Sequence, residues 1–322
     1  MALEVLEGGM LTTVQDLGRY GYQRYGVPVA GAMDPFALQA ANVLVGNSLD
    51  EAALEMTIVG PTFRATASCL IAVTGADMSF RVNGRPLPLW MAIFVRRGWI
   101  IGFGERKRGC RAYLAVAGGI DVPPIMGSKS TYLRGSFGGF QGRALRGGDI
   151  IPVGQTTFHL PSLAGKEFPP DRIPGYSDTP DAHVVLGPQD DYFTEEGMMT
   201  FLSSEYKVSP TSDRMGYRLQ GPEIAHTVPC GTARCQGWAD IISDGIVLGA
   251  VQVPADKQPI VLMADRQTTG GYPKIATVIS ADIPLLAQCM PGASAVTFRA
   301  ITVEEAQARY RGMMMGALGV DS

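Results

Sequence analysis

The chain has 322 residues, of which 46% are hydrophobic and 18% charged, and its formal net charge at neutral pH is −3. This composition excludes a disordered or collagen-like chain, and the length is about twice that of a usual domain, so two domains are expected. The small net charge gives no electrostatic drive toward nucleic acid or anionic lipid, so an anionic substrate would need a local cluster of cations.

The N-terminal half of the chain predicts short strands and one helix. Apolar runs at 69–75 and 111–119 are bounded by turn residues, and Asn83-Gly84 has the composition of a type I′ hairpin turn. Asp34 can cap a helix that has Pro35 at its first position and ends at Gly46.

A proline-rich segment at 161–181 separates two predicted domains. Its five prolines fix φ and remove backbone donors, so neither a helix nor a sheet continues through it. We therefore expect an N-terminal β domain over 1–160, a linker over 161–181, a C-terminal β domain over 182–300, and a helix with a tail over 301–322.

The C-terminal half predicts further short strands, at 183–187, 249–254, 259–265 and 274–280. Three helices are expected: one over about 190–202, a short one that begins at Asp282 and stops before Pro291, and one that begins with Thr302 and Glu305 spaced as a capping box and carries Arg309 and Arg311 toward its C-terminal end. Regularly spaced short strands with few helices predict a mainly β fold and favour closed or nearly closed β-barrels over a doubly wound sheet.

The five cysteines are scattered, which predicts reduced thiols in the cytoplasm. Cys230 and Cys235 lie close in sequence, but no histidine stands at ligand spacing, so we expect no metal site. The first residues, MALEVLEGGM, lack the pattern of a secretory signal, and no apolar run is long enough to span a membrane.

Familiar nucleotide and nucleophile motifs are incomplete. Gly127-Ser128-Lys129-Ser130 resembles the end of a phosphate-binding loop, but the preceding glycine is missing. The glycines at 102, 104 and 109 break the dinucleotide spacing, and a serine-centred nucleophile elbow is absent.

Three polar, glycine-rich segments between the predicted strands are candidates for function. The first, 11–35, is either an ordered loop or a partner-binding surface, because aromatic residues and arginine dominate interface hot spots. The second, 209–224, and the third, 264–280, together offer cations, carboxylates and flexible backbone that could bind a small anion or stabilise an oxyanion. The alternatives are a surface ion pair for the second segment and a plain hairpin loop for the third.

Long contiguous blocks between residues 12 and 288 resemble one known family. They include TTVQDLGRYGY, GVPVAGAMDPFALQAANVLVGN, AYLAVAGGIDVP, GSKSTYLRGSFGG, SDRMGYRLQG and GAVQVPADKQPIVLMADRQTTGGYPKIATVIS. The family is that of the C subunit of 5-oxoprolinase, also labelled KipA-like or allophanate hydrolase subunit 2, and it is related to the carboxyltransferase domain of urea carboxylase. One departure is Lys257, which replaces the usual glycine of the stretch after Pro254.

The resemblance implies two cyclophilin-like β-barrels and a role in the ATP-dependent opening of 5-oxo-L-proline to L-glutamate. It also implies partnership with two other proteins of the 5-oxoprolinase complex, the B subunit (KipI-like) and the A subunit (LamB/YcsF-like). ATP with Mg²⁺ is expected at the level of the complex, with no recognisable binding motif in this chain.

Site residues are predicted on the second and third segments and at the start of the first. Loops of the second barrel are expected to bring cations and amides to one pocket. The catalytic candidates are Arg214, Asp265, Arg266 and Lys274; the substrate-binding candidates are Asp213, Met215, Gly216, Gln252, Gln267, Thr269, Gly270, Gly271 and Tyr272; the partner-binding candidates are Gln15, Asp16, Arg19, Tyr20 and Tyr22.

Two other functions stay open. The first is a KipA-like regulatory protein that binds and antagonises a KipI-like kinase inhibitor. The second is the carboxyltransferase subunit of a biotin-dependent urea or amide carboxylase, which would need its biotin carrier in trans.

Overall fold

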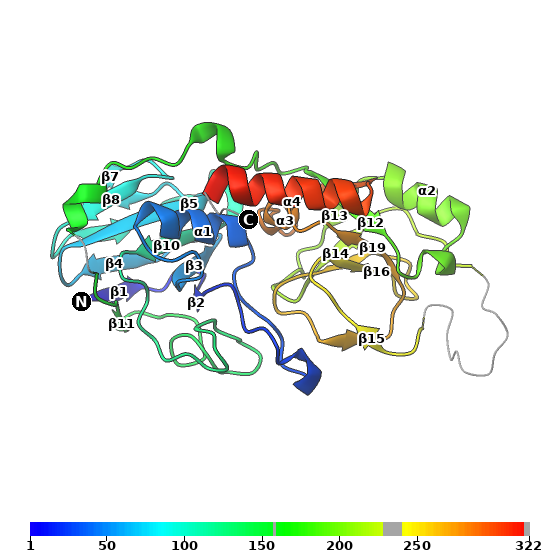
Figure 1. The fold of residues 1–322 in the computed structure, drawn as a ribbon, viewed down its shortest axis with the longest axis horizontal. Helices are drawn as coiled ribbons and strands as arrows, with labels where there is room; N and C mark the ends of the chain where they lie inside the picture. Colours follow the sequence, from blue (N-terminus) through cyan, green and yellow to red (C-terminus); the bar gives the residue numbers. More distant parts are fainter. Residues whose placement is uncertain (157–158, 228–239, 319–322) are drawn as a thin grey trace. The chain divides into compact units, whose positions relative to one another are not determined.

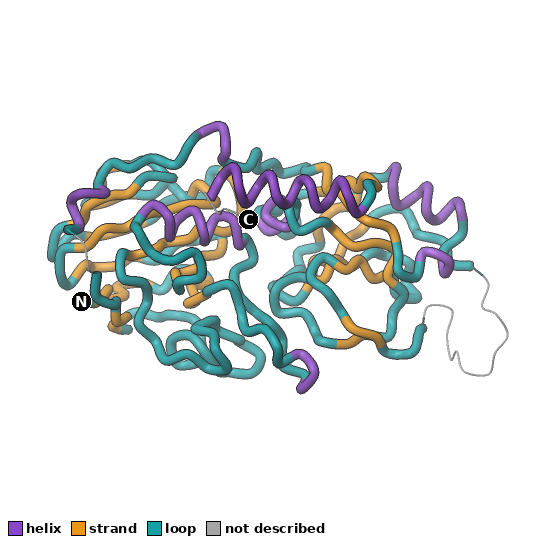
Figure 2. The backbone as a smooth tube through the Cα atoms, viewed as in Figure 1, coloured by secondary structure: helices purple, strands orange, loops and turns teal. Residues whose placement is uncertain are grey.

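The computed structural model describes residues 1–156, 159–227 and 240–318. The chain forms two compact units, one mainly of Met1–Tyr20 and Ala30–Gly175, the other mainly of Gly21–Val29 and Tyr176–Gly316. The change of unit after Gly175 falls inside the proline-rich segment, where the described backbone forms short 3-10 turns at Leu160–Leu163 and Pro170–Arg172. Figures 1 and 2 show strands in both units, and the sheets and closed barrel that they form confirm the mainly β prediction.

The first unit holds two antiparallel sheets. In the six-stranded sheet the order is β11 (Ile150–Pro152), β1 (Ala2–Glu7), β4 (Thr62–Ala65), β9 (Ile100–Gly102), β6 (Arg81–Val82) and β7 (Arg85–Pro86). In the five-stranded sheet it is β2 (Leu11–Gln15), β3 (Ala53–Thr57), β10 (Arg108–Val116), β5 (Cys69–Asp77) and β8 (Ala92–Val95). Side chains from both sheets, such as Val5 and Leu114, meet in one hydrophobic core. That burial is the main stabilising contribution.

Helix α1 (Pro35–Leu44) begins and ends as the sequence predicts. The carboxylate of Asp34 accepts a hydrogen bond from the Ala37 N–H at 2.9 Å, and eight of the ten helical residues are buried. Phe36 packs edge-on against Phe168, with ring centroids 5.9 Å apart. Asn83 and Gly84 both have positive φ between β6 and β7, so the predicted hairpin turn is confirmed.

The second unit is built on a closed barrel, which confirms the predicted barrel there. Its strand order is β12 (Asp181–Leu186), β19 (Lys274–Val278), β16 (Ala250–Gln252), β17 (Ile260–Leu262), β14 (Gly216–Gln220), β13 (Tyr206–Val208) and β20 (Ala295–Ala300). A small separate ribbon pairs β15 (Asp244–Gly245) with β18 (Thr269–Gly270). The rings of Phe201 and Phe298 stack at 4.6 Å inside this unit.

Three helices accompany the barrel, and two of them differ from the sequence prediction. Helix α2 (Glu195–Ser203) begins later than expected, because Thr194 caps it by accepting a bond from the Gly197 N–H at 3.0 Å. Helix α3 (Ile283–Ala287) follows Asp282 as predicted.

Helix α4 (Val303–Leu318) begins with the predicted capping box. The Thr302 N–H donates to Glu305, and the Glu305 N–H donates to the Thr302 hydroxyl. The helix runs on to Leu318, so Arg309 and Arg311 lie in its middle, and their predicted interaction with the C-terminal end of the helix dipole is wrong.

Within the described ranges, none of the helices is both long and apolar enough to cross a membrane. The described residues also contain no cluster of three potential metal ligands. Cys230 and Cys235, the one close pair weighed as a metal site, lie outside the described residues.

Candidate functional site

A polar cluster forms where strands β16 and β19 pair at Gln252 and Lys274. Lys274 is 3% exposed, yet its ammonium group donates to the Asp244 carboxylate at 3.0 Å, and the Asp244 side chain is 55% exposed. A buried lysine stem thus delivers its charge to the edge of the ribbon formed by β15 and β18. We call Asp244, Gln252, Gln267 and Lys274 the barrel-end cluster.

Two amide side chains complete the barrel-end cluster. Gln252 is 2% exposed; its Nε2 donates to the Tyr272 carbonyl at 3.4 Å, and its Oε1 accepts from Gln267 at 3.5 Å. Both bonds are long, so these amides are weakly held by their own chain and are suited to a stronger partner.

Glycine at position 270 leaves room for the Gln252 amide beside this cluster. A Cβ at Gly270 would lie 2.7 Å from Nε2 of Gln252, so the glycine lets β18 approach the amide closely. Thr269 pairs with Gly245 across the ribbon, and the Gly271 carbonyl accepts a bond from Ile241. The structure therefore gathers the predicted substrate-binding residues 269–272 next to the barrel-end cluster.

Asp244 is the member of the cluster whose pKa is shifted by its neighbours. Hydrogen bonding from Lys274 lowers the pKa of Asp244 from its usual value of 3.8, and a second bond from the Gly245 N–H adds to the effect. An ammonium ion with two neutral amides can bind a carboxylate together with a carbonyl or ureido group, or oppose negative charge that develops on an oxygen.

Arg266 is largely buried in the same unit as this cluster. Its guanidinium donates to the carbonyls of Ile246 at 3.4 Å and Met263 at 3.3 Å, and the residue is 8% exposed. Because Ile246 is two residues from Asp244, Arg266 supports the segment that carries the exposed carboxylate.

Arg214 and Asp265 form a separate, buried ion pair. Nε and Nη2 of Arg214 donate to the two carboxylate oxygens of Asp265, each at 3.0 Å, and the residues are 5% and 4% exposed. The neighbouring Asp213 carboxylate accepts from the N–H groups of Met215 and Gly216, which shapes the turn into β14.

The strand register places this ion pair away from the barrel-end cluster. Gly216 pairs with Leu262, and the Leu262 carbonyl bonds Gly249 at the start of β16, whereas Lys274 pairs with Gln252 at the other end of β16. The structure therefore pairs Arg214 with Asp265, at the other end of β16 from Lys274.

In the first unit, Asp16 is the centre of a closed hydrogen-bond network. Its carboxylate accepts from the Ser128 hydroxyl at 2.7 Å, the Lys129 N–H at 2.6 Å and the Gly18 N–H at 2.7 Å, and also from the Ser130 hydroxyl. The segment that resembled a phosphate loop thus directs its donors at a carboxylate of the same chain. These residues do not fit a nucleotide phosphate.

The predicted partner-binding residues separate into buried and exposed groups. Gln15 and Arg19 are 0% and 1% exposed, and the Arg19 guanidinium lies 4.9 Å from the Phe137 ring centroid, so neither offers a free surface and this part of the prediction is corrected. Tyr20 is 68% exposed and Tyr22 is half-buried.

Sequence reasoning missed Asp244, the carboxylate partner of Lys274, and Gln189, whose Oε1 accepts from the Lys274 N–H at 3.1 Å. Asp244 stands in a two-residue strand, 30 residues before Lys274 in the chain. The only available signal was its Asp-Gly pair, which resembles an ordinary turn.

Comparisons with known proteins agree on one family. Residues 25–300 match the family described as "Carboxyltransferase domain, subdomain A and B". The chain is 38% identical over 306 residues to the C subunit of 5-oxoprolinase from Escherichia coli, covering 94% of this chain and 93% of that protein. It is 35% identical over 307 residues to the same subunit of Haemophilus influenzae, with the same two coverages.

Among solved structures, the urea amidolyase of Kluyveromyces lactis superposes with a TM-score of 0.90 at 32% identity. That match covers 97% of this chain but 20% of the urea amidolyase chain. The present fold therefore corresponds to about a fifth of the length of that enzyme.

Proposed function

The chain belongs to the carboxyltransferase family of subdomains A and B, which includes the C subunit of 5-oxoprolinase, and from this we propose that it is part of an ATP-dependent 5-oxoprolinase complex. The complex would open 5-oxo-L-proline to L-glutamate. The observation that carries the proposal is the match to the Escherichia coli protein, which runs over 94% of this chain and 93% of that protein.

The barrel-end cluster supplies chemistry that suits this substrate. 5-Oxoproline carries a carboxylate and a lactam, and the cluster offers the Lys274 ammonium with the amides of Gln252 and Gln267. We assign the ammonium to substrate anion binding or to charge that develops on the lactam oxygen, and the amides to hydrogen bonds with the lactam. Asp244 holds the Lys274 ammonium in place, and is positioned to accept or return a proton.

The buried Arg214–Asp265 pair has a supporting role in this proposal. The Arg214 guanidinium donates two hydrogen bonds to the Asp265 carboxylate. The ion pair therefore holds the turn before β14 against the loop after β17. The loop continues through Arg266 to Gln267, so the pair orients the residues that reach the cluster.

We assign the chain partners of two kinds, a KipI-like protein and a LamB/YcsF-like protein, with the cytoplasm as the compartment. Opening an unstrained lactam requires an energy source, which ATP with Mg²⁺ would supply when bound by the complex. Because the donors of residues 128–130 serve Asp16, we derive no nucleotide site from this chain. The exposed Tyr20 remains a candidate for partner contact.

A second candidate function is the carboxyltransferase half-reaction of a biotin-dependent urea or amide carboxylase. The observation that favours it is the TM-score of 0.90 to urea amidolyase over 97% of this chain. The Lys274 ammonium, the Asp244 carboxylate and the amides of Gln252 and Gln267 could also form hydrogen bonds with a ureido group.

One assay separates these functions. The chain is mixed with its KipI-like and LamB/YcsF-like partners, and glutamate release is measured with 5-oxoproline, with and without ATP, beside transfer of a carboxyl group from carboxybiotin to urea. The proposal expects glutamate only with ATP and all three proteins. Carboxyl transfer without glutamate release would support the second function, and neither product, with the three proteins assembled, would favour the KipA-like regulatory role.

A further inference from the structure

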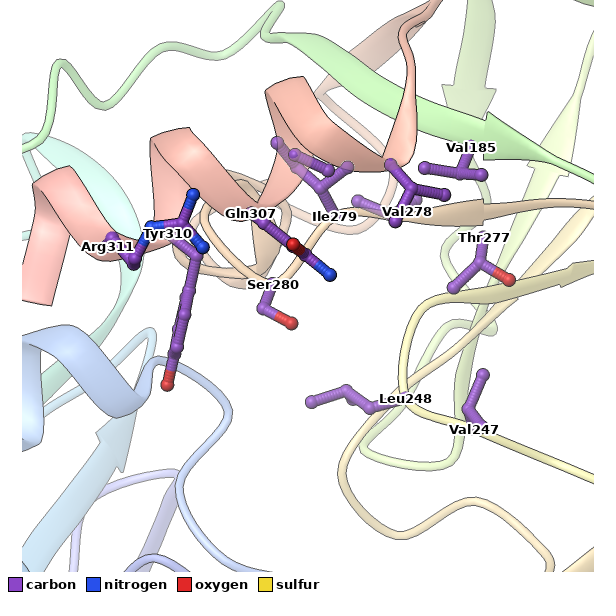
Figure 3. Close-up of a pocket in the computed structure, with 12 residues that line it drawn as sticks. Val185, Val247, Leu248, Thr277, Val278, Ile279, Ser280, Gln307, Tyr310 and Arg311 are labelled. Carbon is purple, nitrogen blue, oxygen red and sulfur yellow. The ribbon is translucent and has the colours of Figure 1, made fainter.

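An apolar groove lies between helix α4 and the barrel, at the other end of β19 from Lys274 (Figure 3). Its volume is about 380 Å³, within the range of roughly 300–1,000 Å³ typical of small-molecule sites. The apolar part of its wall is formed by Val185, Val247, Leu248, Val278, Ile279 and Val303.

One face of α4 forms a side of the groove. Val303, Ala306, Gln307, Tyr310 and Arg311 all line it, and their spacing of three and four residues places them on one side of a helix. Among residues 303–315 none is buried, and Val303 and Tyr310 are 48% and 43% exposed. An isolated helix of this length is marginally stable in water, so an occupant that covers this face would stabilise it.

Polar groups gather along the rim of the groove. Figure 3 shows Gln307 and Tyr310 extending from the helix and Ser280 from the segment that follows β19. In the part of the chain that the structure describes, the side chains of Ser280, Gln307 and Arg311 have no hydrogen-bond or ion-pair partner.

The two arginines of α4 differ in their surroundings. Arg309 does not line the groove and interacts with Glu305, whose pKa is lowered by hydrogen bonds from Thr302 and, to a lesser extent, by the charge of Arg309. Arg311 lines the groove without such a carboxylate. The groove therefore joins an apolar wall to one uncompensated positive charge.

From this combination we propose that the groove is a second binding site, for a small organic anion with an apolar body and a carboxylate or similar head group. The apolar body lies against Val278, Ile279 and Leu248, and the head group accepts hydrogen bonds from Arg311. The site is distinct from the barrel-end cluster, because Lys274 and the groove residues Thr277 and Val278 occupy opposite ends of the five-residue strand β19. The proposal does not depend on the activity proposed above.

Titration calorimetry with octanoate as the probe, and with octan-1-ol as its uncharged counterpart, tests the site on the purified chain. We expect octanoate to bind and octan-1-ol to bind about tenfold more weakly, because only the former carries the charge that Arg311 complements. Absence of octanoate binding at concentrations up to about 10 mM, or equal affinities for the two probes, would overturn the proposal.

Matched variants on the same helix locate the binding. Arg311→Gln should weaken octanoate binding about tenfold, whereas Arg309→Gln should change it less than about twofold. Ala306→Trp fills the groove and should abolish binding, whereas Ala308→Trp, on an exposed position outside the groove, should leave it intact. Circular dichroism checks that all four variants fold. Equal effects within either matched pair would contradict the assignment.

Discussion

Asp16 in the first unit and Asp244 in the second are both carboxylates bound by several donors, but their environments differ. Asp16 is 8% exposed and accepts bonds from two serine hydroxyls and two backbone N–H groups of its own unit. The Asp244 side chain is 55% exposed and is held by the Lys274 ammonium and a neighbouring N–H. The first network is buried and stabilises a loop, whereas the second exposes its carboxylate to solvent beside a buried lysine.

The largest expected effect tests the closed network. Asp16→Ala leaves buried hydroxyl and N–H donors of residues 128–130 without their acceptor, so the free energy of unfolding should fall by roughly 3–5 kcal/mol. Urea denaturation measures it. Asp50→Ala, at an exposed position of the same unit, serves as the control, and its free energy of unfolding should stay within about 0.5 kcal/mol of that of the parent. A loss below about 1 kcal/mol for the Asp16 variant would contradict the account.

The buried ion pair of the second unit gives the next effect. Arg214→Ala leaves the Asp265 carboxylate buried without its guanidinium, so unfolding should become easier by about 3 kcal/mol. The double variant Arg214→Leu, Asp265→Leu should recover much of this loss, since it removes the uncompensated charge. If the double variant were as unstable as the single one, the packing of the two side chains, and not their charges, would account for their contribution to the free energy of unfolding.

Acid titration sharpens the comparison between an enclosed and an open carboxylate. The pKa of Asp149 is lowered by hydrogen bonds from Arg143, at 2.7 and 2.8 Å, and the pKa of Asp244 is lowered by Lys274. A lowered pKa in the folded state stabilises the fold above the usual carboxyl value of 3.8, and this contribution is lost as the pH falls through the lowered pKa.

Asp149→Asn and Asp244→Asn should therefore each lower the Tm at pH 7, and the differences from the parent should vanish toward pH 2. The loss should be larger for Asp149, because its pair is less exposed to solvent. Thermal melts over this pH range provide the measurement. A Tm difference that persisted unchanged at the acid end would rule out the ion pairs as its source.

The smallest expected effect concerns Lys257, at the turn that follows Pro254. Its φ is +59°, a left-handed conformation, and its ammonium pairs with Glu223 at 2.9 Å on the surface. Lys257→Gly relieves the backbone strain, but it loses the surface ion pair and increases the chain entropy of the unfolded state. The free energy of unfolding should therefore change by no more than about 1 kcal/mol. A larger change in the urea midpoint would indicate a role for this turn beyond its conformation.

Local features of the fold could be predicted, because the interactions that cause them are close in sequence. The Asp34 cap, the capping box of Thr302 with Glu305, and the Asn83-Gly84 turn each involve residues at most three positions apart. The end of α4 could not be predicted, because Gly312 directly follows Arg311 as a helix-ending glycine would, yet the helix continues to Leu318.

The site could be predicted only in part, because barrel register is not visible in residue spacing. Lys274 pairs with Gln252, whose amide bonds the Tyr272 carbonyl, whereas Arg214 precedes β14 at the other end of the barrel strands. Asp16 was interpreted as a surface residue because three of its four donors, on Ser128, Lys129 and Ser130, lie 112 to 114 residues away.

The most direct test of the barrel-end cluster is a comparison of Lys274→Met with Lys257→Met in the complete complex. Lys274 is buried with its ammonium at the cluster, whereas the Lys257 side chain is 44% exposed on the surface of the same unit. We predict that Lys274→Met lowers ATP-dependent glutamate release at least about 100-fold, with unfolding changed by about 1 kcal/mol or less, and that Lys257→Met retains full activity. Full turnover by a folded and assembled Lys274→Met variant would contradict the assignment of this cluster.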